Sequence, residues 1–246
     1  MPRAPAAGSD DAEIERIRAE YRRRDREIPP ERYDLSRPAP HFAHARLCAT
    51  LMDALRREGI LPLDGLAVAD AGCGDGTWLC DLARWGADPR KLHGIDLDES
   101  RLAVARRRLP HARLVCGDAR DLPWPSAAFD VVLQFLVFSS ILRASVKQRI
   151  AAEMLRVLKP GGVLLWYDSH WSNPRNPNMR GVGAAETRGL FPGCAVRLLS
   201  VTLAPLLARC VVPLSRPAAR LLERLPFLRT HLFGVVRKPG ARNPVQ

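Results

Sequence analysis

Residues 71–78 read AGCGDGTW and hold three glycines, Gly72, Gly74 and Gly76, between a short apolar run and a helix-like run. Glycine lets the backbone turn sharply and approach a ligand without a Cβ atom in the way. A dinucleotide-binding loop would read GxGxxG, but here the third glycine comes one residue early, and no GxxxxGK[ST] phosphate loop occurs in the sequence. The loop therefore predicts a ligand other than a pyrophosphate.

The rest of the chain alternates between short apolar runs and helix-like runs. The predicted strands are 65–71, 91–97, 112–119, 129–138 and 162–170, and the helices between them are 77–86, 98–109 and 144–162. This alternation implies right-handed crossovers and a parallel sheet with helices on both faces. With two further strands, 194–203 and 230–238, it predicts an α/β fold: a Rossmann-like, doubly wound sheet of seven strands, mostly parallel with one antiparallel edge strand.

Composition limits the classes of protein that fit. No apolar run reaches the roughly 18 residues of a membrane-spanning helix, and the N-terminus lacks the apolar region of a secretion signal, so we expect a cytoplasmic protein. Six cysteines without a CxxC pair or a zinc-like spacing predict free, mostly buried thiols and no metal. The net charge is +12, but scattered arginines and few aromatic residues disfavour nucleic acid; an anionic substrate or membrane surface fits as well.

Acidic residues stand at predicted strand ends beside the glycine loop. Asp96 lies about 20 residues after the glycines, where an acid accepts hydrogen bonds from ribose hydroxyls. Asp118 ends the third strand, where a carboxylate would receive the exocyclic amine of an adenine. Asp70 directly precedes the glycines, and its charge suits a cationic ligand better than a phosphate. The set fits an adenosyl ligand with an amine and a positively charged sulfur.

Four motifs in order, VADAGCGDG, GIDLDES, CGDARDLPWPSAAFDVV and LRVLKPGGVLLW, resemble those of class I S-adenosylmethionine-dependent methyltransferases, in particular the type-11 group that includes ubiquinone and menaquinone methyltransferases. The resemblance spans residues 60–170. It implies S-adenosylmethionine as the donor, S-adenosylhomocysteine as the product, and a donor site with these residues: Asp70, Gly72, Cys73 and Gly74 for the methionyl end, Asp96 and Leu97 for the ribose, Asp118 and Ala119 for the adenine, and Gln134 beside the methyl group.

Two parts of the chain are predicted around this domain. Residues 1–58 contain two helices, 11–27 and 41–58, and are expected to form an N-terminal helical cap over the active site. Residues 59–246 form the predicted methyltransferase domain, with a helical insert at about 204–229 on the acceptor side.

The fifth strand ends in YDSHWS, at the edge that faces the acceptor in this fold. His170 is the candidate general base because an imidazole titrates near neutral pH, although a solvated loop histidine is the plainer interpretation. Asp168 is expected to orient His170 or to act alone. These two residues supply too few oxygen ligands for a catalytic metal, which favours a metal-independent reaction.

Polar residues follow this strand in NPRNPNMRG, residues 173–181. The candidate acceptor-binding residues are Asn173, Arg175, Asn176 and Arg180, together with Tyr21 of the first helix. Forked donors and amides suit sugar hydroxyls, a carboxylate or a phosphate, but prolines and asparagines are also ordinary loop formers.

The insert at 204–229 combines leucines with five arginines, and Pro213 and Pro217 predict two short helices. Such helices either pack over the sheet edge or form an amphipathic patch that meets a membrane surface or a lipid-linked acceptor.

The function expected from these features is methyl transfer to a small or medium polar acceptor, such as a hydroxyl of a sugar, glycan or specialised metabolite. Two alternatives stay open. One is C- or O-methylation of a lipophilic or lipid-linked acceptor, quinone-like or polyketide. The other is a methyltransferase-like module that binds the donor without catalysis. The oligomeric state is not predicted.

Overall fold

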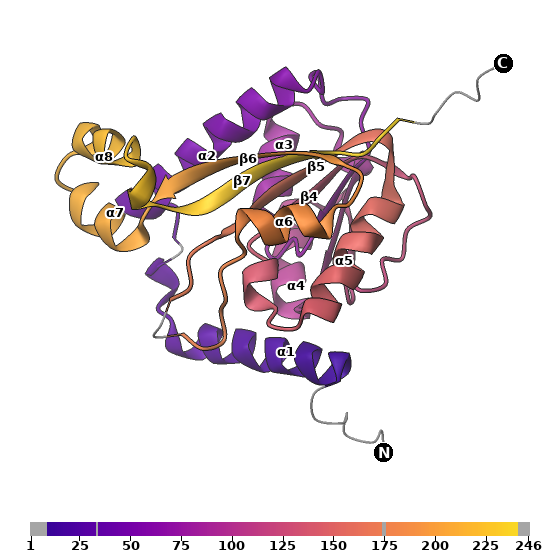
Figure 1. The fold of residues 1–246 in the computed structure, drawn as a ribbon, viewed down its shortest axis with the longest axis horizontal. Helices are drawn as coiled ribbons and strands as arrows, with labels where there is room; N and C mark the ends of the chain where they lie inside the picture. The colour runs from indigo at the N-terminus through magenta and orange to yellow at the C-terminus, as the bar shows by residue number, and fades with distance from the viewer. Residues whose placement is uncertain (1–8, 33, 174–175, 241–246) are drawn as a thin grey trace.

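The computed structural model describes residues 9–32, 34–173 and 176–240. Seven strands form one sheet in the order β3-β2-β1-β4-β5-β7-β6 (Figure 1). The strands are β1 (Val68–Ala71), β2 (Leu92–Asp96), β3 (Arg113–Cys116), β4 (Phe129–Phe135), β5 (Leu158–Ser169), β6 (Ala195–Leu203) and β7 (Arg229–Arg237). The helices are α1 (Asp10–Glu27), α2 (Pro38–Arg57), α3 (Thr77–Arg84), α4 (Glu99–Arg108), α5 (Ala144–Val157), α6 (Ala184–Leu190), α7 (Pro205–Val211) and α8 (Arg216–Glu223).

The predicted fold class is confirmed, with one change in the sheet. Strands β1 to β5 pair in parallel, whereas β7 runs antiparallel to both β5 and β6. The antiparallel strand is therefore not at the edge, as the sequence analysis expected, but second from it. Because β7 reverses direction, its first residues return to the edge of the sheet where β5 ends.

The junction between α5 and β5 also differs from the prediction. The sequence analysis predicted a helix over residues 144–162 and a strand from residue 162. Instead α5 ends at Val157 and β5 begins at Leu158, with a register shift against β4 and a positive φ of 75° at Gly161. The chain therefore turns within the irregular first residues of β5, and no separate loop separates the helix from the strand.

The two faces of the sheet are covered by different helices (Figure 1). On one face, alternate residues such as Leu133 and Leu165 pack with leucines of α2 and α3. On the other face, Val132 and Leu164 pack with α5 and with the apolar side of α1. Helix α2 thus contributes to the core of the domain, and only α1 has the position expected of a cap.

The thiols are less buried than expected. Cys73 and Cys80 are buried, but Cys116 and Cys210 are exposed. Cys116 is exposed because β3 is the edge strand, with three of its four residues open to solvent. Within the described residues, no helix combines the length and apolarity that crossing a bilayer requires.

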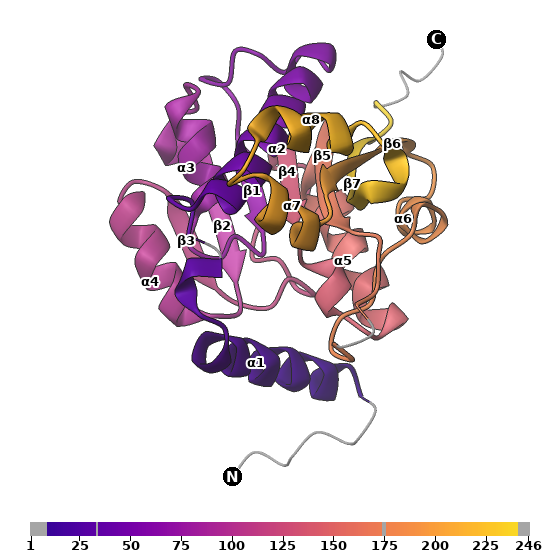
Figure 2. The same ribbon diagram turned by 90° about the vertical axis from the view of Figure 1, so that its left-hand side faces the viewer.

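Figure 2 looks onto the edge at which the parallel strands end. Helices α7 and α8 lie there because they connect the end of β6 to the start of β7, and α1 runs along the same end of the molecule. The glycine loop, the end of β5 and the α7–α8 connection therefore share one edge, where ligands bind in open α/β sheets.

Candidate active site

The glycine loop is a tight turn between β1 and α3. Gly72 has a φ of 88°, and a Cβ atom there would lie 2.3 Å from Cγ2 of Val137. The backbone amides of Gly72 and Cys73 both donate to the carbonyl of Ile95, 2.8 and 3.0 Å away, which ties the loop to β2. Any side chain at Gly72 would displace this loop.

Asp70 is the only fully buried carboxylate of the described chain for which neither oxygen has a hydrogen-bond partner. Burial, with smaller contributions from Asp96 and Asp75, raises the pKa of this carboxyl to about 8. A buried polar group without a partner is costly unless a ligand completes it. A cationic group bound beside the loop would supply that partner and favour the ionised carboxylate.

Asp96 is held in position by backbone donors. Its Oδ2 accepts from the amide of Gly74 at 2.8 Å, and its Oδ1 from the amide of Asp98 at 2.9 Å. Burial raises its pKa, although these two hydrogen bonds act in the opposite direction. A carboxylate oxygen accepts more than one hydrogen bond, so both oxygens retain a lone pair for a diol.

Asp118 is engaged within the protein, which the sequence did not indicate. Its carboxylate accepts from the amide and the Nε of Arg120, both at 2.8 Å, and the same guanidinium reaches Asp11 of α1 at 2.8 Å. Of the other residues implied for the donor, Cys73 points into the core toward Gly94. Leu97 and Ala119 are half-buried and pack against the core on the other face of the sheet, where α1 and α5 lie.

Tyr21 lies on the donor side of the site, not on the acceptor side where the sequence analysis expected it. Its hydroxyl hydrogen-bonds Ser140, its pKa is raised by burial and by the charge of Asp96, and the guanidinium of Arg101 lies 4.8 Å from the centre of its ring. Helix α1 therefore lies over Asp96, the residue predicted to bind the ribose.

Asp168 and Gln134 anchor the segment that follows β4. Asp168 Oδ2 accepts from Gln134 Nε2 at 2.9 Å and from the amides of Phe138 and Ser139 at 2.8 and 3.2 Å, and its Oδ1 accepts from the amide of Ser169. These contacts make Asp168 a positioning residue, and its expected partnership with His170 stays a prediction. The Oε1 of Gln134 is buried without a partner among the described residues.

His170 is half-buried at the end of β5, where its Nε2 lies 3.2 Å from the carbonyl of Arg229. Since a carbonyl only accepts, this contact assigns the ring proton to Nε2 and leaves the lone pair on Nδ1. A second histidine, His231, lies nearby on β7. Burial, followed by the charge of His170, lowers its pKa to about 4, so it is neutral at physiological pH.

A row of aromatic rings crosses the carboxyl ends of β4 and β5 and the start of β7, which runs antiparallel to β5. His231 stacks on Tyr167 with ring centroids 4.9 Å apart, and contacts of 4.7 to 5.8 Å connect Tyr167 to Phe135, Trp78 and His44. The exposed side chain of Leu136 follows directly after Phe135. The sequence analysis missed this row because its members come from five separate elements.

The polar loop after β5 holds α1 in place. Asn178 donates to Glu20 at 2.9 Å and accepts from Arg16 at 3.4 Å. Of the residues predicted to bind the acceptor, Asn176 accepts from the amide of Asn178, Arg180 pairs with Glu186, Asn173 is exposed and accepts from the amide of Asn176, and Arg175 lies outside the described residues. Many polar groups of this loop thus form hydrogen bonds or ion pairs with other residues of the protein.

One cluster has the residue types of a metal site. His44 and Cys48 on α2 and Asp81 on α3 place ligand atoms within 4.8 Å of one another. His44 lies 2.7 Å from Asp81, and Arg84 takes the other carboxylate oxygen at 2.9 Å. Burial raises the pKa of Cys48 to about 12, which keeps the thiol protonated. The cluster is a hydrogen-bonded tie between two helices.

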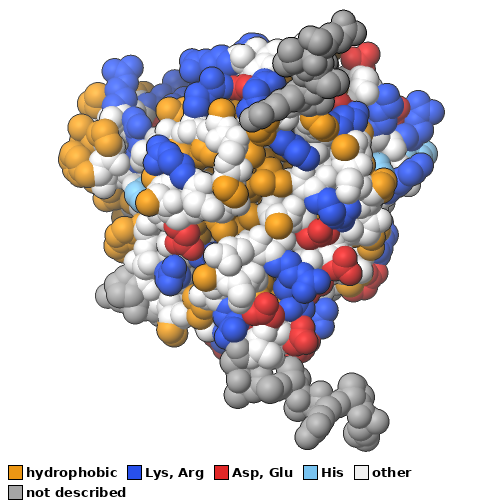
Figure 3. Space-filling model, turned by 45° about the vertical axis from the view of Figure 1, so that its right-hand side comes forward, with side chains coloured by type: hydrophobic (Ala, Val, Ile, Leu, Met, Phe, Trp, Pro, Cys, Tyr) orange, Lys and Arg blue, Asp and Glu red, His pale blue; other side chains and the backbone are white. Residues whose placement is uncertain are grey.

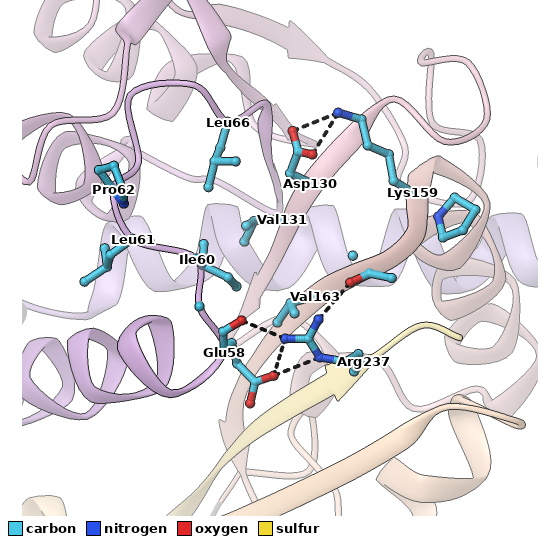
Figure 4. A pocket seen from close by; sticks show the side chains of 14 residues that line it. Glu58, Ile60, Leu61, Pro62, Leu66, Asp130, Val131, Lys159, Val163 and Arg237 are labelled. Carbon is cyan, nitrogen blue, oxygen red and sulfur yellow. Dashed lines mark hydrogen bonds and ion pairs between the residues drawn. The ribbon is translucent and has the colours of Figure 1, made fainter. Parts of the chain in front are cut away.

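A hollow of about 430 Å³ lies at the opposite edge of the sheet (Figure 4). Its charged side chains pair with one another: Lys159 contacts Asp130 at 2.8 Å, and Arg237 contacts Glu58 at 2.6 Å. The charged groups of the hollow are already paired, and the hollow lies where the parallel strands begin, whereas the glycine loop lies where they end. We therefore do not assign the active site to it.

The donor site fits S-adenosylmethionine. The partnerless Asp70 suits a cationic methionyl group. The backbone at Gly74 is open to close approach, because nothing lies within 4 Å of where its Cβ would be. Asp96 presents oriented oxygens for ribose hydroxyls. Asp118 joins this set only if Arg120 shares it with the adenine amine.

Comparisons with known proteins agree with this geometry. Residues 68–162 match the family described as "Methyltransferase domain". A relative from Mycolicibacterium smegmatis, named "Probable S-adenosylmethionine-dependent methyltransferase", is 36% identical over 52% of this chain and 50% of its own. The demethylmenaquinone methyltransferase of Listeria welshimeri is 31% identical over 52% of this chain and 54% of its own. A crystal structure of an S-adenosylmethionine-dependent methyltransferase from Mesorhizobium loti aligns with a TM-score of 0.55 at 21% identity, covering 76% of this chain and 96% of that one.

These findings define the class. Residues 68–162 match a methyltransferase domain, and the chain has the fold of S-adenosylmethionine-dependent methyltransferases. The relatives that match this part of the chain are enzymes of that class. The chain spans about half the length of the curated relatives it matches.

Proposed function

We propose that this protein transfers a methyl group from S-adenosylmethionine to a nucleophilic group, most simply a hydroxyl, of a lipophilic or lipid-linked acceptor. The observation that carries the donor half is Asp70, whose buried oxygens lack a partner next to a glycine loop that tolerates no side chain at Gly72. A bound sulfonium or ammonium group would be a positively charged partner for this carboxylate and would favour its ionised form.

The nature of the acceptor is inferred from the surface over β4, β5 and β7. An aromatic row from Trp78 to His231 lies beneath it, in which Phe135 and Tyr167 are buried and Trp78 and His231 are half-buried. Leu136 and Trp171, which follow β4 and β5 in the chain, are exposed. The polar loop, which would favour a free sugar, uses Asn178 and Arg180 for contacts within the protein. The relative named for demethylmenaquinone also points to a lipid quinone type of acceptor.

In this proposal the chain's residues align the reactants and exclude water. S-adenosylmethionine, when bound, supplies an electrophilic methyl group on a positively charged sulfur. Asp168 fixes the segment that ends at Ser140, and through Ser140 it supports Tyr21 over the donor. The Nδ1 of His170 would accept the proton of an acceptor hydroxyl. Alignment in a closed site provides most of the acceleration for such a displacement.

The remaining expectations follow from this assignment. Helix α1 acts as the cap of the donor site, the segment 204–229 lies on the acceptor side, and the reaction needs no metal. A cytoplasmic location stays an expectation from the sequence.

The test measures donor binding and methyl transfer separately. Asp96→Ala should weaken binding of S-adenosylhomocysteine in calorimetry by about 2–4 kcal/mol, because the ribose hydroxyls lose their acceptor. His170→Gln should bind normally but transfer a tritiated methyl group about 10²–10⁴-fold more slowly, the usual share of a general base.

The acceptor class is read from where the label goes. The protein is incubated with tritiated donor and either a lipid extract or a polar metabolite extract of the source cells. Label in the lipid fraction supports the proposal, and label in the polar fraction alone would reassign the acceptor to a sugar or metabolite. Normal donor binding without transfer to either fraction would make the protein a binding module.

A further inference from the structure

The segment that contains α7 and α8 exposes large apolar side chains on both helices (Leu206, Leu221), between them (Leu214) and in the turn after α8 (Phe227). Leu214 is 87% exposed and Phe227 is 79% exposed, and Leu206 and Leu221 are also more than half exposed. The two helices attach to the domain through a different set of side chains: Ala208, Val212 and Ala219 are buried and pack with Phe42 of α2 and Leu203 of β6. The exposed set therefore belongs to an outer face without a partner in this chain.

The charge of this outer face is almost entirely positive. Four arginines of the segment are exposed, namely Arg209, Arg216, Arg220 and Arg224. The one acid between residues 204 and 229, Glu223, is buried and bound to Arg46 of α2 at 2.6 Å. Arg229 is not part of the face, because its guanidinium donates to the carbonyls of Ser200, Glu223 and Arg224.

The face lies beside the acceptor side of the site. The segment returns to the sheet at Arg229, whose carbonyl contacts His170 at 3.2 Å, and His231 pairs with Ser169 at the end of β5. Figure 2 shows α7 and α8 together at this edge. Whatever the outer face contacts is brought next to the end of β5.

We propose that the outer face of α7 and α8 docks on an anionic lipid bilayer and so holds the acceptor side of the site at the membrane surface. Apolar side chains interleaved with arginines suit the boundary between headgroups and acyl chains, where leucine and phenylalanine enter and guanidinium groups meet phosphates. A second copy of this chain is a poorer occupant, because it would bring the same uncompensated arginines together. The inference rests on the proposed lipophilic acceptor but is measured without donor or acceptor.

Binding is tested with vesicles of phosphatidylcholine alone and of phosphatidylcholine mixed with phosphatidylglycerol. We expect the protein to sediment with the anionic vesicles at least about tenfold more tightly than with the neutral ones. Leu214→Ser with Phe227→Ser should reduce that binding about tenfold or more, because the apolar contact is lost. Leu199→Ser, at an exposed leucine of β6, is the matched control and should bind like the wild type.

The basic side chains are tested in the same assay. Arg216→Gln with Arg220→Gln should lose affinity for anionic vesicles several-fold, whereas Arg57→Gln with Arg107→Gln, a pair of exposed arginines on α2 and α4, should not. An equal loss in both pairs would mean attraction by net charge alone and would overturn the proposal, as would an absence of binding at physiological salt.

Orientation is read from the exposed thiols. An environment-sensitive fluorophore on Cys210 of α7, in a Cys116→Ser background, should shift to the blue on anionic vesicles, and the reciprocal label on Cys116 of β3 should not. If the Leu214/Phe227 substitutions instead abolish self-association in sedimentation velocity, the face is an interface between copies. Because these readouts need no methyl transfer, failure of the proposed reaction would leave them unchanged, and failure of docking would leave donor binding unchanged.

Discussion

At the scale of single residues, Asp70 is a buried carboxyl group whose ionisation costs folding stability. Its folded-state pKa of about 8 lies above the ordinary 3.8, mainly because it is buried. Between these two values the folded protein holds a proton that the unfolded chain has released. The free energy of unfolding therefore falls as the pH rises from about 4 to about 8.

Asp70→Asn should remove this dependence. Thermal or urea unfolding should show the variant close to wild type near pH 5 and more stable by about 2–4 kcal/mol near pH 9. Asp53→Asn, an exposed acid on α2, is the control and should show no such divergence. The same Asp70→Asn protein should bind the donor more weakly by roughly 1.5–3 kcal/mol, the value of a hydrogen bond to a charged group. A gain in both stability and donor affinity would exclude Asp70 from the site.

The residues of the donor site were predictable to the extent that their position follows from strand ends. Asp70 and Asp96 lie where alternating strands and helices put them. The pairing of Asp118 with Arg120 was not predictable, because whether an arginine two residues away turns back depends on Asp11 of α1. His231 escaped notice because it lies at the start of an antiparallel strand, which a parallel pattern puts at the wrong edge.

At the scale of elements, α1 is fastened to the start of α5. Glu13 accepts from the amide of Leu142 and pairs with Arg16, which in turn donates to the carbonyl of Ser140 at 2.6 Å. One buried carboxylate thus holds both the helix and the segment after β4.

Glu13→Ala should lower the free energy of unfolding by about 1–3 kcal/mol at neutral pH, because buried donors lose their acceptor. The matched control is Glu15→Ala on the exposed side of α1, whose pair with Arg18 should be worth less than about 1 kcal/mol. Burial alone would raise the pKa of Glu13, but its hydrogen bonds with Arg16 and Leu142 lower it overall.

The sign of the pH dependence follows from that lowered pKa. The stabilisation by Glu13 is present above the unfolded value of 4.5 and is lost as the pH falls below it. Chemical denaturation of both variants at neutral and at acid pH measures this effect. Equal losses in Glu13→Ala and Glu15→Ala, or a difference that grows in acid, would contradict the assigned role.

Element boundaries were predictable where caps are local. Asp98 was expected to begin α4, and its side chain does accept from Ser100 and Arg101. Pro213 lies between α7 and α8 as expected, but Pro217 lies within the first turn of α8, where a proline needs no amide partner. The irregular start of β5 was not predictable, since the pairing of Leu158 with Phe129 is contributed by the neighbouring strand.

At the scale of the whole molecule, the charge of +12 is dispersed. Figure 3 shows basic side chains spread over one face among apolar and acidic ones. Many arginines form ion pairs with nearby acids, as Arg23 does with Glu20 and Glu27, and Arg24 with Glu20, on α1.

Nucleic acid should therefore bind weakly and without preference. We expect a dissociation constant on the order of 10–100 µM for duplex or single strands at physiological salt. The affinity should fall further as salt is added. Fluorescence anisotropy with unrelated sequences of equal length provides the measurement. Sub-micromolar, sequence-selective binding would contradict the small-molecule assignment.

The overall topology was the most predictable feature, because each crossover helix and buried strand leaves its own pattern. The place of the antiparallel strand was not predictable. The sequence of a strand does not show its direction or its neighbours, and the position of β7 between β5 and β6 follows from its pairing with both.

The strand order has a consequence for how such a protein changes its specificity. The proposed donor residues lie over β3, β2 and β1 and the proposed acceptor side over β5, β7 and β6, with β4 between them. The matched domain ends at residue 162, before β6 and β7 begin, so the two halves are also separate along the chain. We expect a change of the segment between Leu203 and Arg229 to alter the proposed acceptor side and to leave the geometry of the proposed donor side intact. One sheet thus carries two parts that can change separately. Replacing the last third of the chain should change the acceptor without altering the residues proposed to bind the donor.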